Sequence, residues 1–298
     1  MHKRPHHLAD ASPVCPNWKF ALPALALALC SLLAQAQPKH RPAAGNAAPT
    51  EFKLPVNAKH AVVLEDSSGR VLMEKNADVV VPIASLTKLM TAMVVLDAQP
   101  DMNEKIRIAD ADVDTLKHSA SRVKVGAEMT RLAALKLALM SSENRAAAAL
   151  ARTYPGGLER FKLAVQAKIR NLGLVRTAIN EPTGLSPSNT STAMEVAKIA
   201  NAAARYPEIS RITSDKKDIV PVSGRPRELH NTNSLVGAKG WDILLSKTGY
   251  TEEAGRCLTM RMRSGGKPIT LVLLDADGSA QRQRDAAKIR QSLAKLRS

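Results

Sequence analysis

Residues 82–92 read PIASLTKLMTA and place a serine and a lysine three positions apart at the start of an apolar helical pattern. The pattern predicts a helix from Ser85 to about residue 99, just before a proline. Its apolar stripe consists of Leu86, Leu89, Met90, Met93, Val94 and Leu96. A spacing of three puts Lys88 on the same face as Ser85, one turn away. Because the neighbours are apolar, we expect burial to lower the pKa of Lys88 so that it can accept a proton from serine.

The Ser-x-x-Lys spacing alone is a weak signal. It occurs five times in the chain, beginning at Ser85, Ser121, Ser214, Ser264 and Ser292. Serine is also a good helix N-cap, and a lysine three residues later often faces water, so a purely structural role for the pair stays open. What distinguishes Ser85 is its place at the start of an apolar helix.

The segments around this helix predict an α+β fold. Two strands at 61–66 and 71–76 flank a polar turn, and residues 131–203 continue as helices. Further strands are expected near 219–222, 243–249, 257–263 and 268–276, with a hairpin turn at 264–267 and a final helix at 281–296. Helices inserted between the strands of one antiparallel sheet predict a sheet flanked by helices plus an all-helical lobe, with a shared cleft.

Two other short motifs occur once each in the chain. SEN at 142–144 lies at the break between two predicted helices, where its serine is also a reasonable helix cap. KTG at 247–249 ends a predicted strand, and its glycine leaves room for a substrate backbone to lie against that strand. A hairpin with an exposed lysine is the structural alternative. SEN begins 57 residues after Ser85 and KTG 105 residues after that, and the three motifs together are a strong signal.

In this order, SLTK, SEN and KTG resemble the signature of the serine penicillin-recognising enzymes, the penicillin-binding proteins and serine β-lactamases. The stretches EPTGLSPSNTSTA at 181–193, NTNSLV at 231–236 and SKTGYTEEAGRCL at 246–258 resemble the low-molecular-mass D-alanyl-D-alanine peptidases. The resemblance covers residues 58–280. It implies a β-lactamase/transpeptidase-like fold that needs no metal and no cofactor.

The C-terminal part of the chain favours one branch of that family. Many carboxypeptidases of the group add a β-rich domain and an amphipathic membrane-anchoring tail after the catalytic domain. Here 49 residues follow Gly249, and the predicted strands and final helix take them up. The resemblance therefore favours a D,D-endopeptidase that cuts the peptide cross-links of peptidoglycan, with a D-alanyl-D-alanine carboxypeptidase as the alternative.

The resemblance also implies catalytic roles. Ser85 attacks the carbonyl of a D-alanine residue, and neutral Lys88 acts as the general base. An acyl-enzyme forms, which β-lactams would block covalently. Ser142, with help from Lys247, passes a proton to the departing amine, and water then releases the acyl group.

Five residues are implied to bind the substrate. Asn144 holds a backbone amide, and Lys247 and Thr248 bind the carboxylate next to the cut bond. Gly249 lies in the strand along which the substrate runs. The backbone N–H of Tyr250, with that of Ser85, forms the oxyanion hole.

Three other functions compete with this interpretation. Glu181 lies between SEN and KTG, where a β-lactamase would have a deacylating glutamate. The second is an inactive module that has the three motifs and binds the cell wall through its positive charge but does not hydrolyse it. A metallopeptidase is disfavoured because His40, His60, His118 and His230 have no paired ligand spacing.

The first 36 residues have the features of a secretory signal peptide. Three basic residues precede an apolar run at 20–33 that ends in Ala34-Gln35-Ala36, so we expect cleavage after Ala36 and a periplasmic protein. The 14 apolar residues are too few to span a bilayer comfortably. Residues 37–58, rich in Pro and Ala, are expected to form a flexible lead-in, and 59–298 a single catalytic domain with two lobes.

Charge and cysteine content limit the partners. The formal net charge is +16, of which the leader carries +2, so the exported chain favours an anionic partner such as the wall or lipid headgroups, unless the charge serves solubility alone. Nucleic acid is excluded by export and by an aromatic content of 3%. Cys257 is the one cysteine after the leader, so no internal disulfide is possible, and we expect it to be a buried apolar side chain. Trp241 and Tyr250 are candidates for the border of the substrate groove, with packing as the alternative for Trp241.

Overall fold

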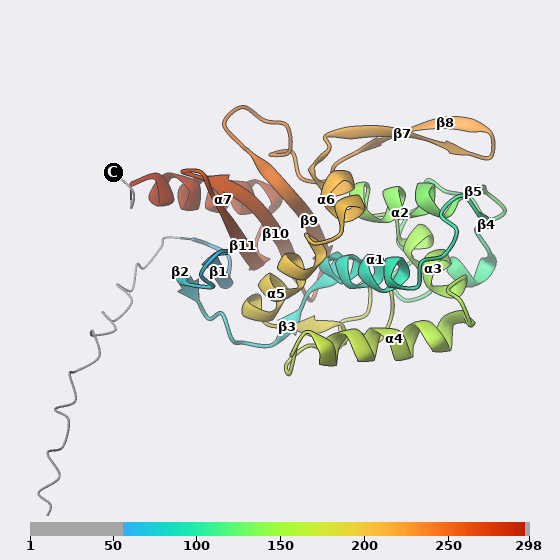
Figure 1. Cartoon of the computed structure of the whole chain (residues 1–298), viewed down its shortest axis with the longest axis horizontal. Helices are drawn as coiled ribbons and strands as arrows, with labels where there is room; N and C mark the ends of the chain where they lie inside the picture. The colour runs from blue at the N-terminus through green and yellow to red at the C-terminus, as the bar shows by residue number, and fades with distance from the viewer. Residues whose placement is uncertain (1–55, 296–298) are drawn as a thin grey trace, which may run out of the picture. The chain divides into compact units, whose positions relative to one another are not determined.

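The computed structural model describes residues 56–295, which belong to one compact unit, Ala47–Ser298 (Figure 1). The expected signal peptide at 1–36 lies outside the described residues, as does the lead-in up to residue 55. Within residues 56–295, no helix combines the length and the apolar composition needed to cross a membrane.

The folded part begins earlier than the sequence predicted. Val56 and Ala58 are buried in the apolar cluster between the sheet and the last helix. The backbone N–H groups of Asn57 and Ala58 donate to the same carboxylate oxygen of Asp285, at 2.8 and 2.9 Å. The expected flexible segment therefore extends three residues too far, because a buried acid on the last helix fixes this backbone.

A five-stranded antiparallel sheet has the strand order β2-β1-β11-β10-β9. Its strands are β1 (His60–Glu65), β2 (Val71–Lys75), β9 (Ile243–Thr251), β10 (Gly255–Ser264) and β11 (Lys267–Ala276). The two predicted hairpins, β1–β2 and β10–β11, are confirmed. β9, which carries the KTG motif, pairs only with β10 and is an edge strand of this sheet.

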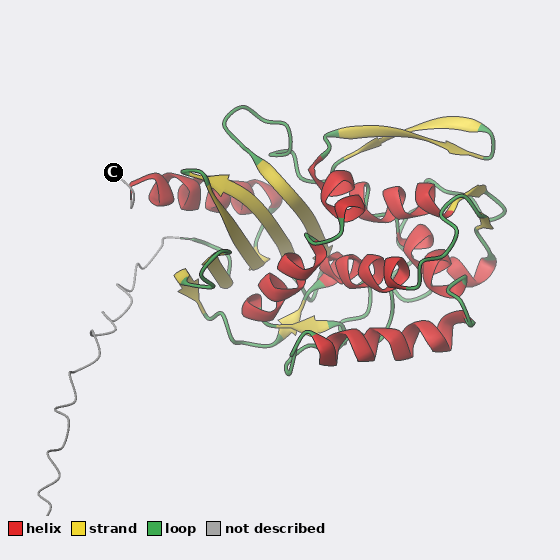
Figure 2. Cartoon of the chain, viewed as in Figure 1, coloured by secondary structure: helices red, strands yellow, loops and turns green. Residues whose placement is uncertain are grey.

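Helices cover both faces of the sheet (Figures 1 and 2). Successive side chains of a strand point to opposite faces, and β11 shows the result. Its Leu271 and Leu273 pack in the cluster with α7 (Ser279–Lys295), whereas Val272 and Leu274 pack in the cluster with the first half of α5 (Ala193–Ala203). Neither face of β11 meets water, and its sequence ITLVLL is accordingly apolar except for Thr270, whose buried hydroxyl donates to Asp66 at 2.6 Å.

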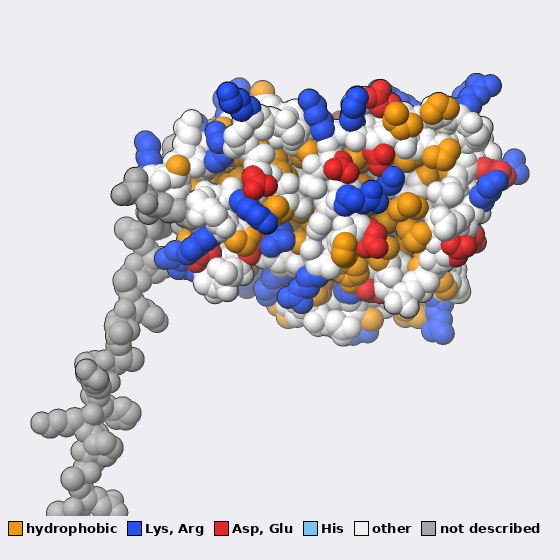
Figure 3. All heavy atoms as spheres, turned by 45° about the horizontal axis from the view of Figure 1, so that its top comes forward, with side chains coloured by type: hydrophobic (Ala, Val, Ile, Leu, Met, Phe, Trp, Pro, Cys, Tyr) orange, Lys and Arg blue, Asp and Glu red, His pale blue; other side chains and the backbone are white. Residues whose placement is uncertain are grey.

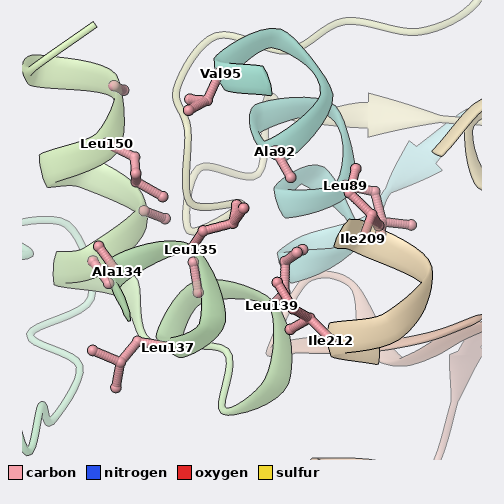
Figure 4. Close-up of a cluster of buried hydrophobic side chains, with 14 of the residues drawn as sticks. Leu89, Ala92, Val95, Ala134, Leu135, Leu137, Leu139, Leu150, Ile209 and Ile212 are labelled. Atoms are coloured by element: carbon pink, nitrogen blue, oxygen red, sulfur yellow. The ribbon is translucent and has the colours of Figure 1, made fainter. Parts of the chain in front are cut away.

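The remaining helices pack around a separate apolar core (Figure 4). They are α1 (Thr87–Asp97), α2 (Arg131–Met140), α3 (Asn144–Arg152), α4 (Gly157–Asn171) and α6 (Pro207–Ser214). The labelled side chains in Figure 4, among them Leu89, Leu135 and Ile209, come from different helices and meet in this core. The buried side chains of α1 belong to this core, so the core fixes the position of the helix that carries the lysine of the Ser-x-x-Lys motif.

The predicted helical block at 131–203 is only partly correct. Residues 172–192 form a loop with one short strand, because Gly173, Pro182, Gly184 and Pro187 interrupt helical structure there. α5 does not belong to the helical lobe alone, since its first half packs on the sheet and its second half, with Ile199, joins the helical core. α6 was not predicted.

Three short strand pairs lie outside the main sheet. β3 (Val81–Pro82) pairs with β6 (Thr190–Ser191), and β4 (Lys105–Arg107) pairs with β5 (Glu128–Thr130). The predicted strand at 219–222 is present as part of β7 (Lys217–Val222), but it pairs with β8 (Arg225–His230) in a hairpin of its own and not with the main sheet. Figure 1 shows this hairpin beside α6 and α2.

Candidate active site

Ser85 lies in a 3-10 turn, η1 (Ala84–Leu86), that leads directly into α1. The N-cap position of this turn is Ile83, and no side chain caps it, so the capping role considered for Ser85 is wrong. α1 itself begins at Thr87, two residues after the predicted start. Ala84 has a φ of +46°, which is uncommon for a residue with a side chain. This strained turn leaves the Ser85 hydroxyl free to contact Lys88.

The Lys88 amine is surrounded by three oxygen atoms. Its Nζ lies 2.7 Å from Ser85 Oγ, 2.8 Å from Asn144 Oδ1 and 2.6 Å from the carbonyl oxygen of Thr183. The side chain is otherwise enclosed, and the residue is only 1% exposed. The Asn144 amide is oriented by its own Nδ2, which donates to Ser119 Oγ at 2.9 Å. The lysine expected to act as a base is therefore buried against the serine expected to be the nucleophile.

These three contacts suit both charge states of Lys88. An ammonium donates one N–H to each oxygen, whereas a neutral amine has two N–H groups and one lone pair. The carbonyl oxygens of Asn144 and Thr183 can only accept, so they take the two N–H groups. The lone pair is then left for the Ser85 hydroxyl, which becomes the donor. The same 2.7 Å contact can thus carry the serine proton to the amine.

Burial sets the electrostatics of the site. It lowers the pKa of Lys88 from 10.5 to about 7, against a smaller raising effect of the Glu181 and Glu143 carboxylates. Burial, together with the charges of Lys88 and Arg282, also holds the pKa of Lys247 well below its usual value. Both lysines therefore give up a proton more readily than an exposed lysine does.

The SEN motif forms the break between α2 and α3. Ser142 has a φ of +59°, and Glu143 is the N-cap of α3, its side chain accepting from the N–H of Arg145. The capping role considered for Ser142 is therefore wrong. Its Oγ instead accepts from Lys247 Nζ at 2.8 Å. The structure thus brings Ser142 and Lys247 together as a second serine–lysine contact beside the first.

The KTG motif lies inside β9, which continues to Thr251. Lys247 also donates to the Thr248 carbonyl at 2.9 Å, and the Thr248 hydroxyl donates to Thr232 Oγ1 at 2.7 Å. Gly249 has a structural role that was not predicted. A Cβ at Gly249 would lie 2.9 Å from the backbone nitrogen of Ser85, so glycine lets β9 approach η1.

The loop at 181–189 supplies a contact that the sequence analysis missed. Glu181 accepts from the N–H and the hydroxyl of Thr183, at 2.7 and 2.6 Å, and from the N–H of Gly184 at 2.6 Å. Its carboxylate also accepts from the Asn189 amide at 3.0 Å. These bonds fold the loop so that the Thr183 carbonyl meets Lys88. The Pro-Thr-Gly sequence at 182–184 indicates a turn. It does not indicate the contact with Lys88, because every residue has a backbone carbonyl.

Tyr250, Trp241 and Cys257 differ in their surroundings. Tyr250 is 49% exposed, and the Arg256 guanidinium lies 3.6 Å from its ring centroid. Trp241 packs against the cluster with α7, so it is a packing residue and does not border the groove. Cys257 is buried, as expected, and burial raises the pKa of its thiol to about 12.

A loop before α2 lies across the site. Asp114 accepts from three backbone N–H groups of this loop, including that of Ser119, whose hydroxyl orients Asn144. Lys117 forms an ion pair with Glu253 in the turn between β9 and β10. The loop therefore links the helical side of the site to the sheet side.

Among the described residues, no three His, Cys, Asp or Glu side chains converge as metal ligands.

The fold and the site have the features of a serine acyl-transfer enzyme, with a serine hydroxyl in contact with a buried lysine. A family model described as D-alanyl-D-alanine carboxypeptidase matches residues 46–278. The chain belongs to this family, and the predicted resemblance is confirmed.

Two curated relatives and two solved structures support this assignment. The D-alanyl-D-alanine endopeptidase of Pseudomonas aeruginosa is 45% identical over 235 residues, 78% of this chain and 76% of the relative. That of Escherichia coli is 40% identical over 277 residues, 92% and 88% of the two chains. The Streptomyces K15 DD-transpeptidase has a TM-score of 0.75 at 26% identity, covering 82% of this chain and 99% of that one. Penicillin-binding protein D2 from Listeria monocytogenes, in a cefotaxime-bound form, has a TM-score of 0.72 at 28% identity, with 81% and 98% coverage. The predicted fold class is confirmed.

The lowered pKa of Lys88 predicts how acylation depends on pH. The neutral amine is the base, so acylation by a fluorescent penicillin should rise about tenfold per pH unit below pH 7 and level off above it. Lys88→Arg keeps a positive charge at every accessible pH and should lower the acylation rate by about 10² to 10⁴-fold. A flat profile between pH 5 and 9, or normal acylation of the arginine variant, would show that Lys88 is not the base.

Gly184 predicts a sharp local effect of one methyl group. Its φ is +83°, and a Cβ would lie 1.9 Å from the carbonyl oxygen of Ala84, so Gly184→Ala must displace the 181–189 loop from η1. Gly266→Ala is the matched control, because Gly266 also has a positive φ, +77°, but nothing lies within 4 Å of its Cβ position. We expect the control to lose about 1 kcal/mol of unfolding free energy in urea and to acylate normally. Gly184→Ala should lose at least about 2 kcal/mol more and acylate slowly. Equal losses in the two variants would contradict this packing.

Proposed function

We propose that this protein is an exported serine D-alanyl-D-alanine endopeptidase that hydrolyses the peptide cross-links of peptidoglycan. The observation that carries the proposal is the pair of buried serine–lysine contacts, 2.7 Å between Ser85 and Lys88 and 2.8 Å between Ser142 and Lys247. Family membership and relatives named as endopeptidases, at 40% and 45% identity, support the choice of substrate.

The first half of the reaction forms an acyl-enzyme. Ser85 Oγ attacks the D-alanine carbonyl carbon while its proton moves to the lone pair of Lys88. The developing oxyanion is stabilised by the backbone N–H groups of Ser85 and Tyr250. The C–N bond then breaks, and the proton that Lys88 took passes to the departing nitrogen through Ser142, which Lys247 contacts, so that Lys88 is neutral again. The acyl group remains on Ser85 as an ester.

The second half returns the enzyme to its starting state. A water molecule attacks the ester carbonyl and gives a proton to neutral Lys88. The Ser85 oxygen then leaves and takes this proton back from Lys88. Lys247 and Thr248 bind the carboxylate of the departing residue in the first half, and this residue leaves before water attacks. Because a cross-link and a terminal D-alanine both have this carboxylate, the same residues serve an endopeptidase and a carboxypeptidase reaction.

A β-lactamase is disfavoured by the contacts of Glu181. Both of its carboxylate oxygens accept hydrogen bonds from its own loop, from Thr183, Gly184 and Asn189. A deacylating glutamate needs a free oxygen for the attacking water. β-lactams are therefore expected to act as covalent inhibitors that leave Ser85 slowly.

The proposed compartment is based on residues 1–36, and the proposed partners are based on the positive net charge of the chain. The features of residues 1–36 support export to the periplasm, where cross-linked peptides are found. Lys and Arg side chains are spread over the face shown in Figure 3, and a net charge of +14 without the leader supports peripheral association with the anionic wall or with membrane headgroups. No role with nucleic acid is proposed.

Cleavage products test the proposal directly. Purified chain without the leader should split cross-linked dimeric muropeptides into monomers, as seen by mass. Ser85→Ala should lower this rate by about 10³-fold or more. Ser292→Ala, in a Ser-x-x-Lys stretch on α7, is the matched control and should cut normally. If only pentapeptide monomers are shortened, the protein is a carboxypeptidase, and if bound penicillin turns over rapidly, it is a β-lactamase.

A further inference from the structure

A cavity of about 430 Å³ opens beside Ser142, between the turn before α3 and strand β8. Its wall includes Arg122, Ser142, Arg227, His230 and Thr232. We call it the departing-strand pocket. Ser85, Lys88 and Gly249 do not line it, so it lies on one side of the reacting bond and not over the nucleophile.

The side on which the pocket lies follows from two shared residues. Ser142, in the pocket wall, is the residue that gives a proton to the departing nitrogen in the proposed reaction. Thr232, also in the wall, accepts the hydrogen bond of the Thr248 hydroxyl at 2.7 Å, and Thr248 binds the carboxylate of the departing residue. A group that leaves from this position therefore continues into the pocket.

The two arginines of the pocket form no ion pair within residues 56–295. Among the described residues, the side chains of Arg122 and Arg227 have no ion-pair or hydrogen-bond partner. The acids of the same wall are already engaged. Glu143 accepts from Ser121 at 2.7 Å, and Glu228 lies 3.5 Å from Lys217. The pocket thus presents two free guanidinium groups, which match carboxylates in geometry and charge.

Both arginines are carried by fixed backbone. Arg122 lies between Ser121, which donates to Glu143, and Val123, whose carbonyl accepts from Arg145 at 2.8 Å. Arg227 lies on β8, two residues before Leu229 and on the same face of the strand. Leu229 is buried in the helical core. The two charges are therefore carried by two different segments of the pocket wall, the loop before α2 and strand β8.

We infer that the departing-strand pocket binds the peptide that leaves when a cross-link is cut, with Arg122 and Arg227 pairing with its carboxylates. This inference rests on the proposed function. A departing peptide continues beyond the cut bond and carries at least one further carboxylate, at its own C-terminus. A terminal D-alanine ends at the carboxylate that Lys247 and Thr248 bind, so none of it reaches the arginines. The pocket is therefore specific for the endopeptidase reaction.

The test compares two substrates on the same variants. The double variant Arg122→Gln with Arg227→Gln should lose about 10 to 100-fold in kcat/KM on a cross-linked dimer, mainly through KM. Its cleavage of pentapeptide monomers and its acylation by penicillin should stay within about twofold, which also shows that it folds. Arg225→Gln, which removes the same charge from the same strand outside the pocket wall, should match the wild type on every substrate.

Amidation of the substrate gives an independent readout. A dimer whose departing peptide is amidated only at its C-terminal carboxylate, and not at the carboxylate beside the cut bond, should be cut by the wild type as slowly as the free-acid dimer is cut by the double variant. The double variant should not distinguish the two dimers. Equal losses on dimer and pentapeptide, or no loss on the dimer, would overturn the pocket assignment alone. If the wild type leaves the dimer intact while it shortens pentapeptides, the proposed function fails, and the pocket assignment fails with it.

Discussion

The buried Lys88 amine, with two carbonyl oxygens and one hydroxyl within 2.8 Å, is the interaction on which the rest of the site depends. Removing an ammonium from water disfavours its charged form, and the carbonyl oxygens give its N–H groups partners in either state. The lone pair of the neutral amine then has one possible donor, Ser85. Burial and geometry together, and not the spacing of three residues, suit this lysine to the proposed role of a base.

Three distant segments have to meet for this contact to form. α1 supplies the lysine, the first residue of α3 supplies Asn144, and the 181–189 loop supplies the Thr183 carbonyl. Glycine makes two of the approaches possible, since a Cβ at Gly184 or Gly249 would collide with η1. The Glu181 carboxylate organises the loop by accepting hydrogen bonds from the backbone N–H groups of Thr183 and Gly184. The strained turn at Ala84 and Ser85 is thus held from two sides.

Local periodicity made much of this architecture predictable. The hairpins, α1 and α7 have clear apolar patterns or turn residues, so their existence and approximate ends were right. The polar β8 and the short α6 have no such pattern, and their pairing depends on distant parts of the chain. At the site, the motif side chains could be named from the sequence. The Thr183 carbonyl and the reason for Gly249 could not, because both are properties of backbone that is brought together only by folding.

The most direct test of the central claim is the pKa of Lys88 itself, measured by NMR on protein with 13C at the lysine Cε position. Lys88→Met and Lys247→Met variants assign the signals of the two buried lysines. The account predicts that the Lys88 signal titrates at about 7. A signal that titrates near 10.5, the ordinary value for lysine, would mean that Lys88 is an ammonium throughout the neutral range and would contradict its role as the base.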